Sequence, residues 1–126
     1  MKLVIRSVGS AAHPNLRRDT PNDPEKFAEF VHVDIGTKPG KGADTFTILV
    51  ATPSGLASLE DRDGIIAQRP VVILRRFDVD VLWRWLEKTV SACEAETWPQ
   101  SVEKLQHFFN WEFAYLEKSK SGPSQP

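Results

Sequence analysis

The chain has 126 residues, of which 40% are hydrophobic and 26% are charged, and its 16 basic and 17 acidic side chains give a formal net charge of −1. This length predicts a single domain, and the composition is that of a folded protein rather than a disordered one. The balanced charge argues against nucleic acid as a partner, because sequence-independent binding of DNA or RNA requires a basic surface.

Cysteine content and hydropathy indicate a cytoplasmic protein. Cys93 is the only cysteine, which excludes an internal disulfide and a multi-cysteine zinc site. At the N-terminus, an apolar run of three residues is interrupted by Arg6, so it is too short for a signal peptide. Because no segment approaches the ~18 apolar residues of a membrane span, we expect no contact with a membrane.

The first predicted element is a strand over residues 2–8. Alternation would place Leu3, Ile5 and Ser7 on one face, with Val8 on the other. Residues 9–25 contain three prolines and a glycine, which predicts a long and mobile loop whose role the sequence does not identify.

A hairpin is predicted next. Residues 27–36 alternate, with apolar side chains such as Phe27 and Val31 on one face. A turn that contains two glycines and a proline joins them to residues 43–51, which are rich in β-branched and aromatic side chains. We therefore expect these two strands to pair in the antiparallel sense.

A fourth strand is predicted within residues 68–76, "QRPVVILRR". Its compact apolar run is typical of a strand that is central in a sheet and buried on both faces. Between the third and fourth strands, Thr52 or Ser54 is placed to cap a short helix or turn.

Two C-terminal helices follow. Asp78 is a candidate N-cap for a helix that buries one stripe, listed as Leu82, Trp85, Leu86, Thr89, Val90 and Cys93. Thr97 and Gln100, at capping-box spacing, begin a second helix that we expect to run to Lys118.

The second predicted helix carries five aromatic residues within 108–115. Its spacing places Phe109, Phe113 and Leu116 against the sheet, with Trp111 and Tyr115 on the flank. Glu112 lies among these aromatic residues and is expected to pair with an arginine such as Arg75 or Arg76, because an unpaired carboxylate is costly to desolvate.

The order of elements predicts an α+β domain over residues 1–118, in which two C-terminal helices pack on one face of an antiparallel sheet of about four strands. Residues 119–126 have no apolar side chain other than proline and are expected to form a disordered tail. The other face of the sheet would be shielded by the 9–25 loop or offered to a partner.

We find no pattern that predicts a catalytic, cofactor or metal site. The three histidines, His13, His32 and His107, have no second ligand at a suitable spacing. The glycine-rich turn lacks the phosphate-loop pattern. Glu60, Asp61 and Asp63 form only part of a calcium loop. On its buried stripe, Cys93 is expected to act as a small hydrophobe.

The order of the motifs over residues 2–117 resembles the immunity protein 8 family of bacterial polymorphic-toxin systems. The residues that carry the resemblance are Ile35, Gly36, Phe46, Thr52, Pro53, Leu56, Trp98, Trp111, Glu112, Phe113, Ala114 and Tyr115. The resemblance implies a cytoplasmic, non-enzymatic protein that inhibits the toxin encoded beside it. An exposed sheet face or edge would permit a dimer, so we expect a monomer or homodimer.

Candidate contacts with such a toxin are acidic, hairpin and aromatic residues, namely Glu60, Asp61, Asp63, Lys41, Asp44 and Trp83. Two alternatives stay open. One is a small enzyme or ligand-binding domain with a pocket between sheet and helices and with Glu112, Tyr115 and His107 at its mouth. The other is an adaptor subunit of a larger assembly.

Overall fold

The computed structural model of the chain describes residues 1–59, 65 and 70–116. The elements in chain order are β1 (Leu3–Gly9), β2 (Ala28–Thr37), β3 (Asp44–Ala51), α1 (Pro53–Ser58), β4 (Val71–Ile73), α2 (Val79–Ala92), α3 (Trp98–Leu105) and β5 (Asn110–Trp111). The strands form one sheet in the order β1-β2-β3-β4, and β5 also pairs with β3.

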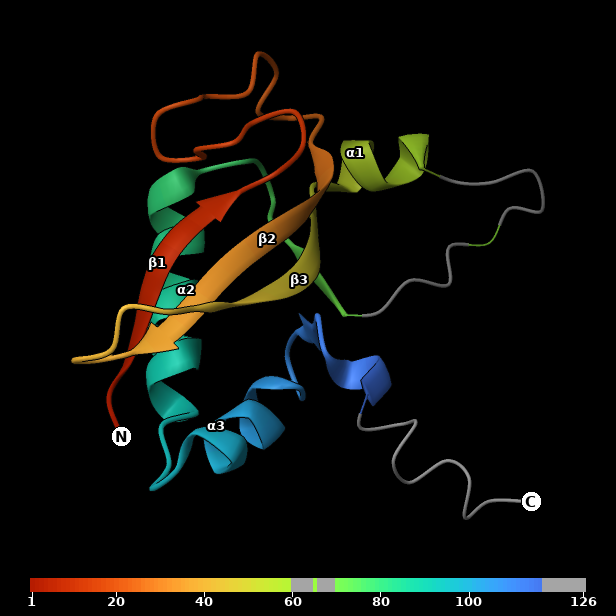
Figure 1. Cartoon of the computed structure of the whole chain (residues 1–126). Helices are drawn as coiled ribbons and strands as arrows, with labels where there is room; N and C mark the ends of the chain where they lie inside the picture. Colours follow the sequence, from red (N-terminus) through yellow and green to blue (C-terminus); the bar gives the residue numbers. More distant parts are fainter. Residues whose placement is uncertain (60–64, 66–69, 117–126) are drawn as a thin grey trace.

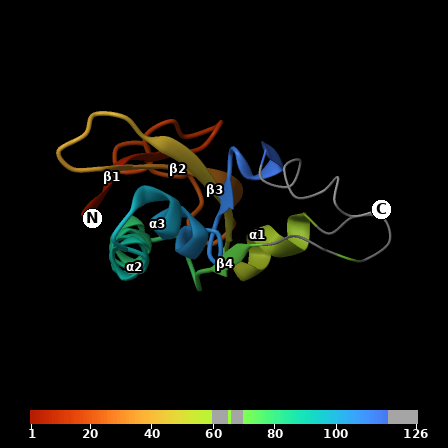
Figure 2. The same cartoon turned by 60° about the horizontal axis from the view of Figure 1, so that its bottom comes forward.

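The helices α2 and α3 lie on one face of the sheet, as predicted (Figures 1 and 2). α2 begins at its predicted cap, where the Asp78 carboxylate accepts the N–H groups of Asp80 and Val81. In Figure 1, β1, β2 and β3 are seen from the opposite face, and no helix lies in front of them. The α+β class with C-terminal helices on one face is therefore confirmed, and the opposite face is left open.

A β-bulge changes the predicted faces of β1. Ile5 pairs with Ile35 and Ser7 with Asp34, so Arg6 is an extra residue in the ladder. Because one inserted residue reverses the alternation, Val8 joins the core and Ser7 turns to the open face. The predicted placement of Ser7 and Val8 was therefore wrong.

The β2–β3 hairpin forms as predicted, with an antiparallel register from Ala28↔Ala51 to Ile35↔Asp44. Gly36 is required at its turn end, because a Cβ on this residue would lie 2.0 Å from the Gly42 carbonyl oxygen. At the other end, Thr52 caps α1 by accepting the Gly55 N–H. The hairpin thus aligns the two longest strands and presents alternate side chains to the helices.

β4 differs from the prediction of a central strand buried on both faces. It has three residues, lies at the edge of the sheet and pairs with β3 in the parallel sense. Val72 packs against the core, whereas Val71 and Ile73 are exposed. Buried and exposed side chains alternate along β4 because helices cover only one of its two faces.

The predicted last helix is wrong beyond Leu105. α3 ends there, and β5 then pairs with β3 through Trp111 opposite Phe46 and Asn110 opposite Thr47. Helical structure returns only at 114–116. Phe109 is buried in the core as expected, but Phe113 and Leu116 are exposed.

The loop between β1 and β2 packs at the end of the helical layer. Leu16 is buried in the core, and the Arg17 guanidinium lies 4.2 Å from the centroid of the Trp83 ring on α2. The loop is also held to β2, where His13 Nδ1 lies 2.9 Å from the Glu29 carboxylate. It therefore joins the covered side and does not shield the open face.

Candidate partner-binding surfaces

The chemically reactive side chains of the protein are dispersed. Within residues 1–59, 65 and 70–116, no group of three or more His, Cys, Asp or Glu side chains is placed to hold a metal ion. Cys93 is buried, and burial raises the pKa of its thiol, an effect that Lys104 partly opposes. A thiol with a raised pKa is a weak nucleophile at neutral pH, so this residue has the surroundings of a packing side chain.

The open sheet face is polar at the turn end of the hairpin. Asp34 accepts hydrogen bonds from Ser7 Oγ at 2.6 Å and Thr45 Oγ1 at 2.7 Å. One row further along, His32 Nδ1 lies 3.1 Å from Thr47 Oγ1. These cross-strand bonds fix the side chains of three neighbouring strands, so this end of the face is a rigid polar surface.

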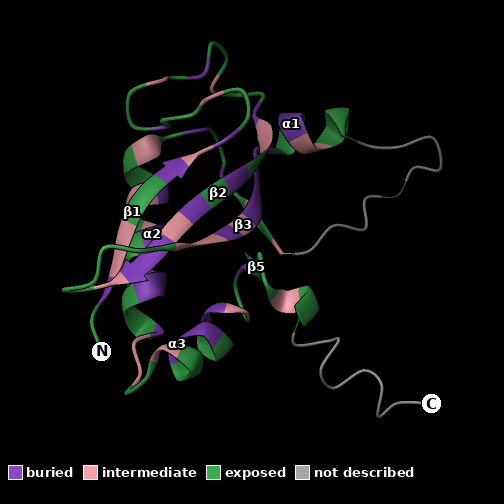
Figure 3. Cartoon of the chain, viewed as in Figure 1, coloured by how far each residue is buried: buried purple, intermediate pink, exposed green. Residues whose placement is uncertain are grey.

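The other end of the same face is apolar. Phe30, Leu49 and Val71 lie in one cross-strand row, and Ile73 lies in the next. Leu49 is buried, but Phe30 is 48% exposed, Val71 39% and Ile73 53%. In Figure 3, buried positions alternate with exposed or intermediate ones along the middle of β2. An apolar centre beside a polar rim is the usual composition of a protein–protein interface.

The segment after α3 is tied to the edge of β3 by hydrogen bonds that sequence reasoning missed. Glu112 donates its N–H to the Thr45 carbonyl at 3.0 Å, and its carboxylate accepts the Thr45 N–H at 2.6 Å. Trp111 Nε1 donates to the Asp44 carboxylate at 2.9 Å. The expectation that Glu112 pairs with Arg75 or Arg76 was wrong, because its carboxylate binds the Thr45 N–H instead, and Arg76 pairs with Glu25.

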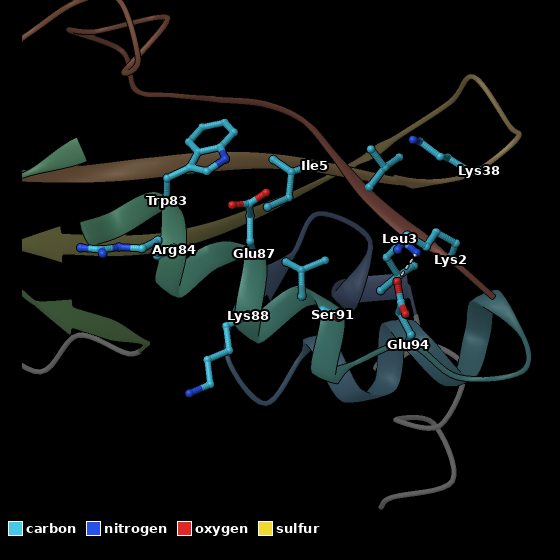
Figure 4. Close-up of a pocket in the computed structure, with 12 residues that line it drawn as sticks. Lys2, Leu3, Ile5, Lys38, Trp83, Arg84, Glu87, Lys88, Ser91 and Glu94 are labelled. Carbon is cyan, nitrogen blue, oxygen red and sulfur yellow. Dashed lines mark hydrogen bonds between the residues drawn. The ribbon is translucent and has the colours of Figure 1, made fainter. Parts of the chain in front are cut away.

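A groove of about 640 Å³ separates β1 from α2. Figure 4 shows Ile5 of β1 beside Trp83 and Glu87 of α2, and shows the hydrogen bond at one end from the Leu3 N–H to the Glu94 carboxylate. This bond is 2.9 Å long. One side of the groove is therefore formed by the edge strand β1 and the other by the helix α2.

The predicted contact residues fall in different places. Lys41 is exposed in the hairpin turn, Asp44 is held by Trp111, and Trp83 lies in the β1–α2 groove beneath Arg17. The acidic candidates Glu60, Asp61 and Asp63 lie outside the described residues. Of the described candidates, Trp83 lines the β1–α2 groove and Asp44 lines a smaller hollow of about 230 Å³ beside the hairpin turn.

The alternative pocket is not assembled as predicted. His107 lines a depression of about 460 Å³ with neighbours that include Glu103 and Lys104. Glu112 is bonded to the backbone of β3 instead, and Tyr115 is 63% exposed. These three side chains therefore do not share the surroundings that the enzyme alternative required.

Four residues of the resemblance, Gly36, Phe46, Trp111 and Glu112, stabilise the sheet and the elements packed on it. Phe46 is fully buried and makes edge-on contacts with Trp98 and Phe109, at centroid distances of 6.4 and 6.3 Å. Gly36 permits the close approach of the turn described above. Trp111 and Glu112 tie the C-terminal segment to β3. These aromatic and glycine residues of the resemblance therefore have structural roles in this fold.

The fold and its surfaces define a small α+β protein with an open sheet face suited to contact with another protein. Over residues 3–115 the chain matches the family described as Immunity protein 8, and it belongs to that family. This family is one of immunity proteins, which act against toxins. No curated protein and no solved structure matches the chain. Among the described residues, no helix is both long and apolar enough to cross a membrane.

Proposed function

We propose that this protein is a cytoplasmic bacterial immunity protein that binds a cognate polymorphic toxin and neutralises it as a stoichiometric inhibitor. The observation that carries the proposal is the family match over residues 3–115, which spans nearly the whole chain. We propose that the protein acts by binding and catalyses no reaction. Its partner is the toxin encoded by a neighbouring gene, and residues 1–118 act as one domain that is a monomer or homodimer.

The open sheet face supports this function and is the surface that we propose for the main contact. Its apolar end combines exposed Phe30, Val71 and Ile73 with a polar rim at Asp34 and Thr45. Aromatic side chains near the centre of an interface commonly account for much of the binding free energy. Phe30 is therefore the proposed anchor, and Lys41 at the turn is a proposed contact at the rim.

The test is co-expression of this protein with the toxin encoded by the neighbouring gene, followed by measurement of host survival and of co-purification. We expect rescue together with a complex of equal stoichiometry. A harmless neighbour, or rescue without a complex, would refute inhibition by binding.

A matched pair of variants tests the surface. Phe30→Glu places a charge on the open face, and Val81→Glu makes the same change at an exposed position of α2 on the helical side. We expect Phe30→Glu to weaken binding by about 30-fold or more and Val81→Glu to leave it within about threefold. Equal effects of the two variants would exclude the open face as the main contact.

A further inference from the structure

The strand β1 has a free edge whose middle is open. It is the terminal strand of the sheet, and in the part of the chain that the structure describes it pairs on one side only, with β2 (Figure 1). In an antiparallel pair, alternate residues turn their N–H and C=O groups outward. The Leu3 N–H donates outward to Glu94, and the Val8 carbonyl accepts from the Leu16 N–H at 3.1 Å.

Ile5 lies between these two occupied positions. It is two residues from Leu3 on the same strand and precedes the bulge, so its N–H and C=O also point outward. A residue in this position can exchange two backbone hydrogen bonds with an added strand. The open part of the edge is therefore short and is centred on Ile5.

The outer edge of β3, on the other side of the sheet, is covered by two short strands and by Glu112. β4 pairs with β3 at Leu49–Ala51, β5 pairs with it at Phe46 and Thr47, and Glu112 occupies the backbone of Thr45. Proteins usually cover their edge strands in such ways, because unpaired backbone groups are a template for another strand. The terminal strands on that side, β4 and β5, have only three and two residues, whereas β1 has seven. Among the described residues, β1 therefore offers the longest edge to an added strand.

The groove beside this edge has the form needed for strand addition. Trp83 and Glu87 face Ile5 from α2, and Ser91 lies further along the same wall (Figure 4). An extended segment in the groove would pair with the backbone of Ile5 and rest on the side chains of α2. Strand addition beside a helix is a recurrent mode of peptide recognition, in which backbone bonds supply affinity and side-chain contacts supply selectivity.

The charge of the groove indicates what kind of segment fits. Its lining has four basic residues, Lys2, Lys38, Arg84 and Lys88, and two acidic ones, Glu87 and Glu94. The groove is thus net positive, whereas the whole chain has a formal charge of −1. A second copy of β1 would bring its own Lys2 and Arg6 into this positive groove. An acidic segment of another protein is the better electrostatic match.

We propose that the groove between β1 and α2 binds an extended acidic segment of the cognate toxin, which pairs with the outward backbone of Ile5 as an added strand. This inference rests on the proposed immunity function. It identifies a second contact, at the β1 edge of the sheet, whereas the exposed Phe30 lies on the open face of β2.

Two variants of one residue test the backbone bond. Ile5→Pro removes the outward N–H without removing a hydrogen bond to β2, and proline is tolerated on edge strands. Ile5→Ala is the matched control, because it loses the same packing against the core and keeps the N–H. With the inactivated toxin encoded by the neighbouring gene as the probe, we expect calorimetry to show Ile5→Pro binding about tenfold or more weaker than Ile5→Ala.

Hydrogen exchange on the unmodified protein gives a second readout that does not depend on how a variant folds. The outward amide of Ile5 should become protected when the toxin binds. Arg84→Glu together with Lys88→Glu should weaken binding, more strongly at low salt than at high salt.

The possible outcomes separate the two proposals. Unmodified protein that fails to bind the toxin overturns both. Normal binding with equal affinities of the two Ile5 variants and no protection of Ile5 overturns only the strand addition. Light scattering on the free protein gives the third outcome. If the unmodified protein and Ile5→Ala are dimers and Ile5→Pro is a monomer, the edge of β1 binds a second copy of the chain, and the proposed strand addition by the toxin is overturned.

Discussion

The closest backbone approach in the hairpin yields a quantitative prediction for Gly36→Ala. The new Cβ would lie 2.0 Å from the Gly42 carbonyl oxygen, whereas ordinary contacts begin at 3.4 Å, so the two segments must separate by about 1.4 Å. Both groups are backbone, and no rotamer change relieves the clash. We therefore expect Gly36→Ala to lower the free energy of unfolding by about 3 kcal/mol, which is at the upper end of the usual range for substitutions that overpack a structure.

Gly42→Ala is the matched control, because it changes the other member of the same contact. A Cβ on Gly42 meets nothing within 4 Å, and its φ lies outside the left-handed region. This variant should be neutral or more stable by up to about 1 kcal/mol. Urea unfolding followed by tryptophan fluorescence measures the free energy of unfolding of both variants. In thermal unfolding, Gly36→Ala should melt about 10 °C below the unmodified protein. Equal free energies of unfolding for the two variants would refute the steric argument.

Three further predictions concern single side chains. Phe46→Ala should cost about 3–5 kcal/mol in urea unfolding, whereas Tyr115→Ala, also in the resemblance, should stay within about 0.5 kcal/mol because it is exposed. Glu112→Ala should cost about 1 kcal/mol by the same measurement and Glu112→Gln less, because the amide oxygen still accepts the Thr45 N–H. Cys93 should react slowly with iodoacetamide at pH 8 until the protein unfolds. Because the pKa of its thiol is higher in the folded state than in the unfolded state, its contribution to stability should be complete below the unfolded-state pKa and should be lost as the pH rises through the folded-state pKa. The Cys93→Ala variant should not show this loss.

The central hairpin and α2 were predictable because their patterns are local. The alternation over residues 27–36 follows from one buried face, and the structure buries Val31 and Val33 on that face. Asp78 caps α2 through atoms within three residues of itself. Such features depend on neighbouring residues in the chain, so a single sequence contains the information.

The errors lie where a distant partner decides the structure. The spacing of aromatic residues over 105–116 fits a helix, but the outer edge of β3 at Phe46 and Thr47 is open, and Asn110 and Trp111 pair with it. β4 looked buried because its run is apolar, whereas only a sheet covered on both faces would bury Val71 and Ile73. Neither condition is visible in the local pattern.

The candidate surfaces were harder to predict than the fold. The acidic and hairpin residues were selected for expected exposure, which does not distinguish one exposed surface from another. The β1 edge depends on the bulge at Arg6, on Glu94 and on Leu16, which come together only in three dimensions. The apolar row at Phe30 likewise requires the registers of three strands.

One binding partner can contact both proposed surfaces, which leads to a last prediction. Ile5 pairs with Ile35 of β2, and Phe30 lies five residues from Ile35 on the same strand, or about 17 Å along it. A standard interface buries about 800 Å² on each partner and is therefore about 28 Å across. If the toxin covers Phe30 and also pairs with Ile5, the binding losses of Phe30→Glu and Ile5→Pro should add within about 0.5 kcal/mol in the double variant. A Phe30→Glu variant that abolishes the protection of the Ile5 amide in a complex that still forms would contradict this independence, because the two contacts would then be coupled.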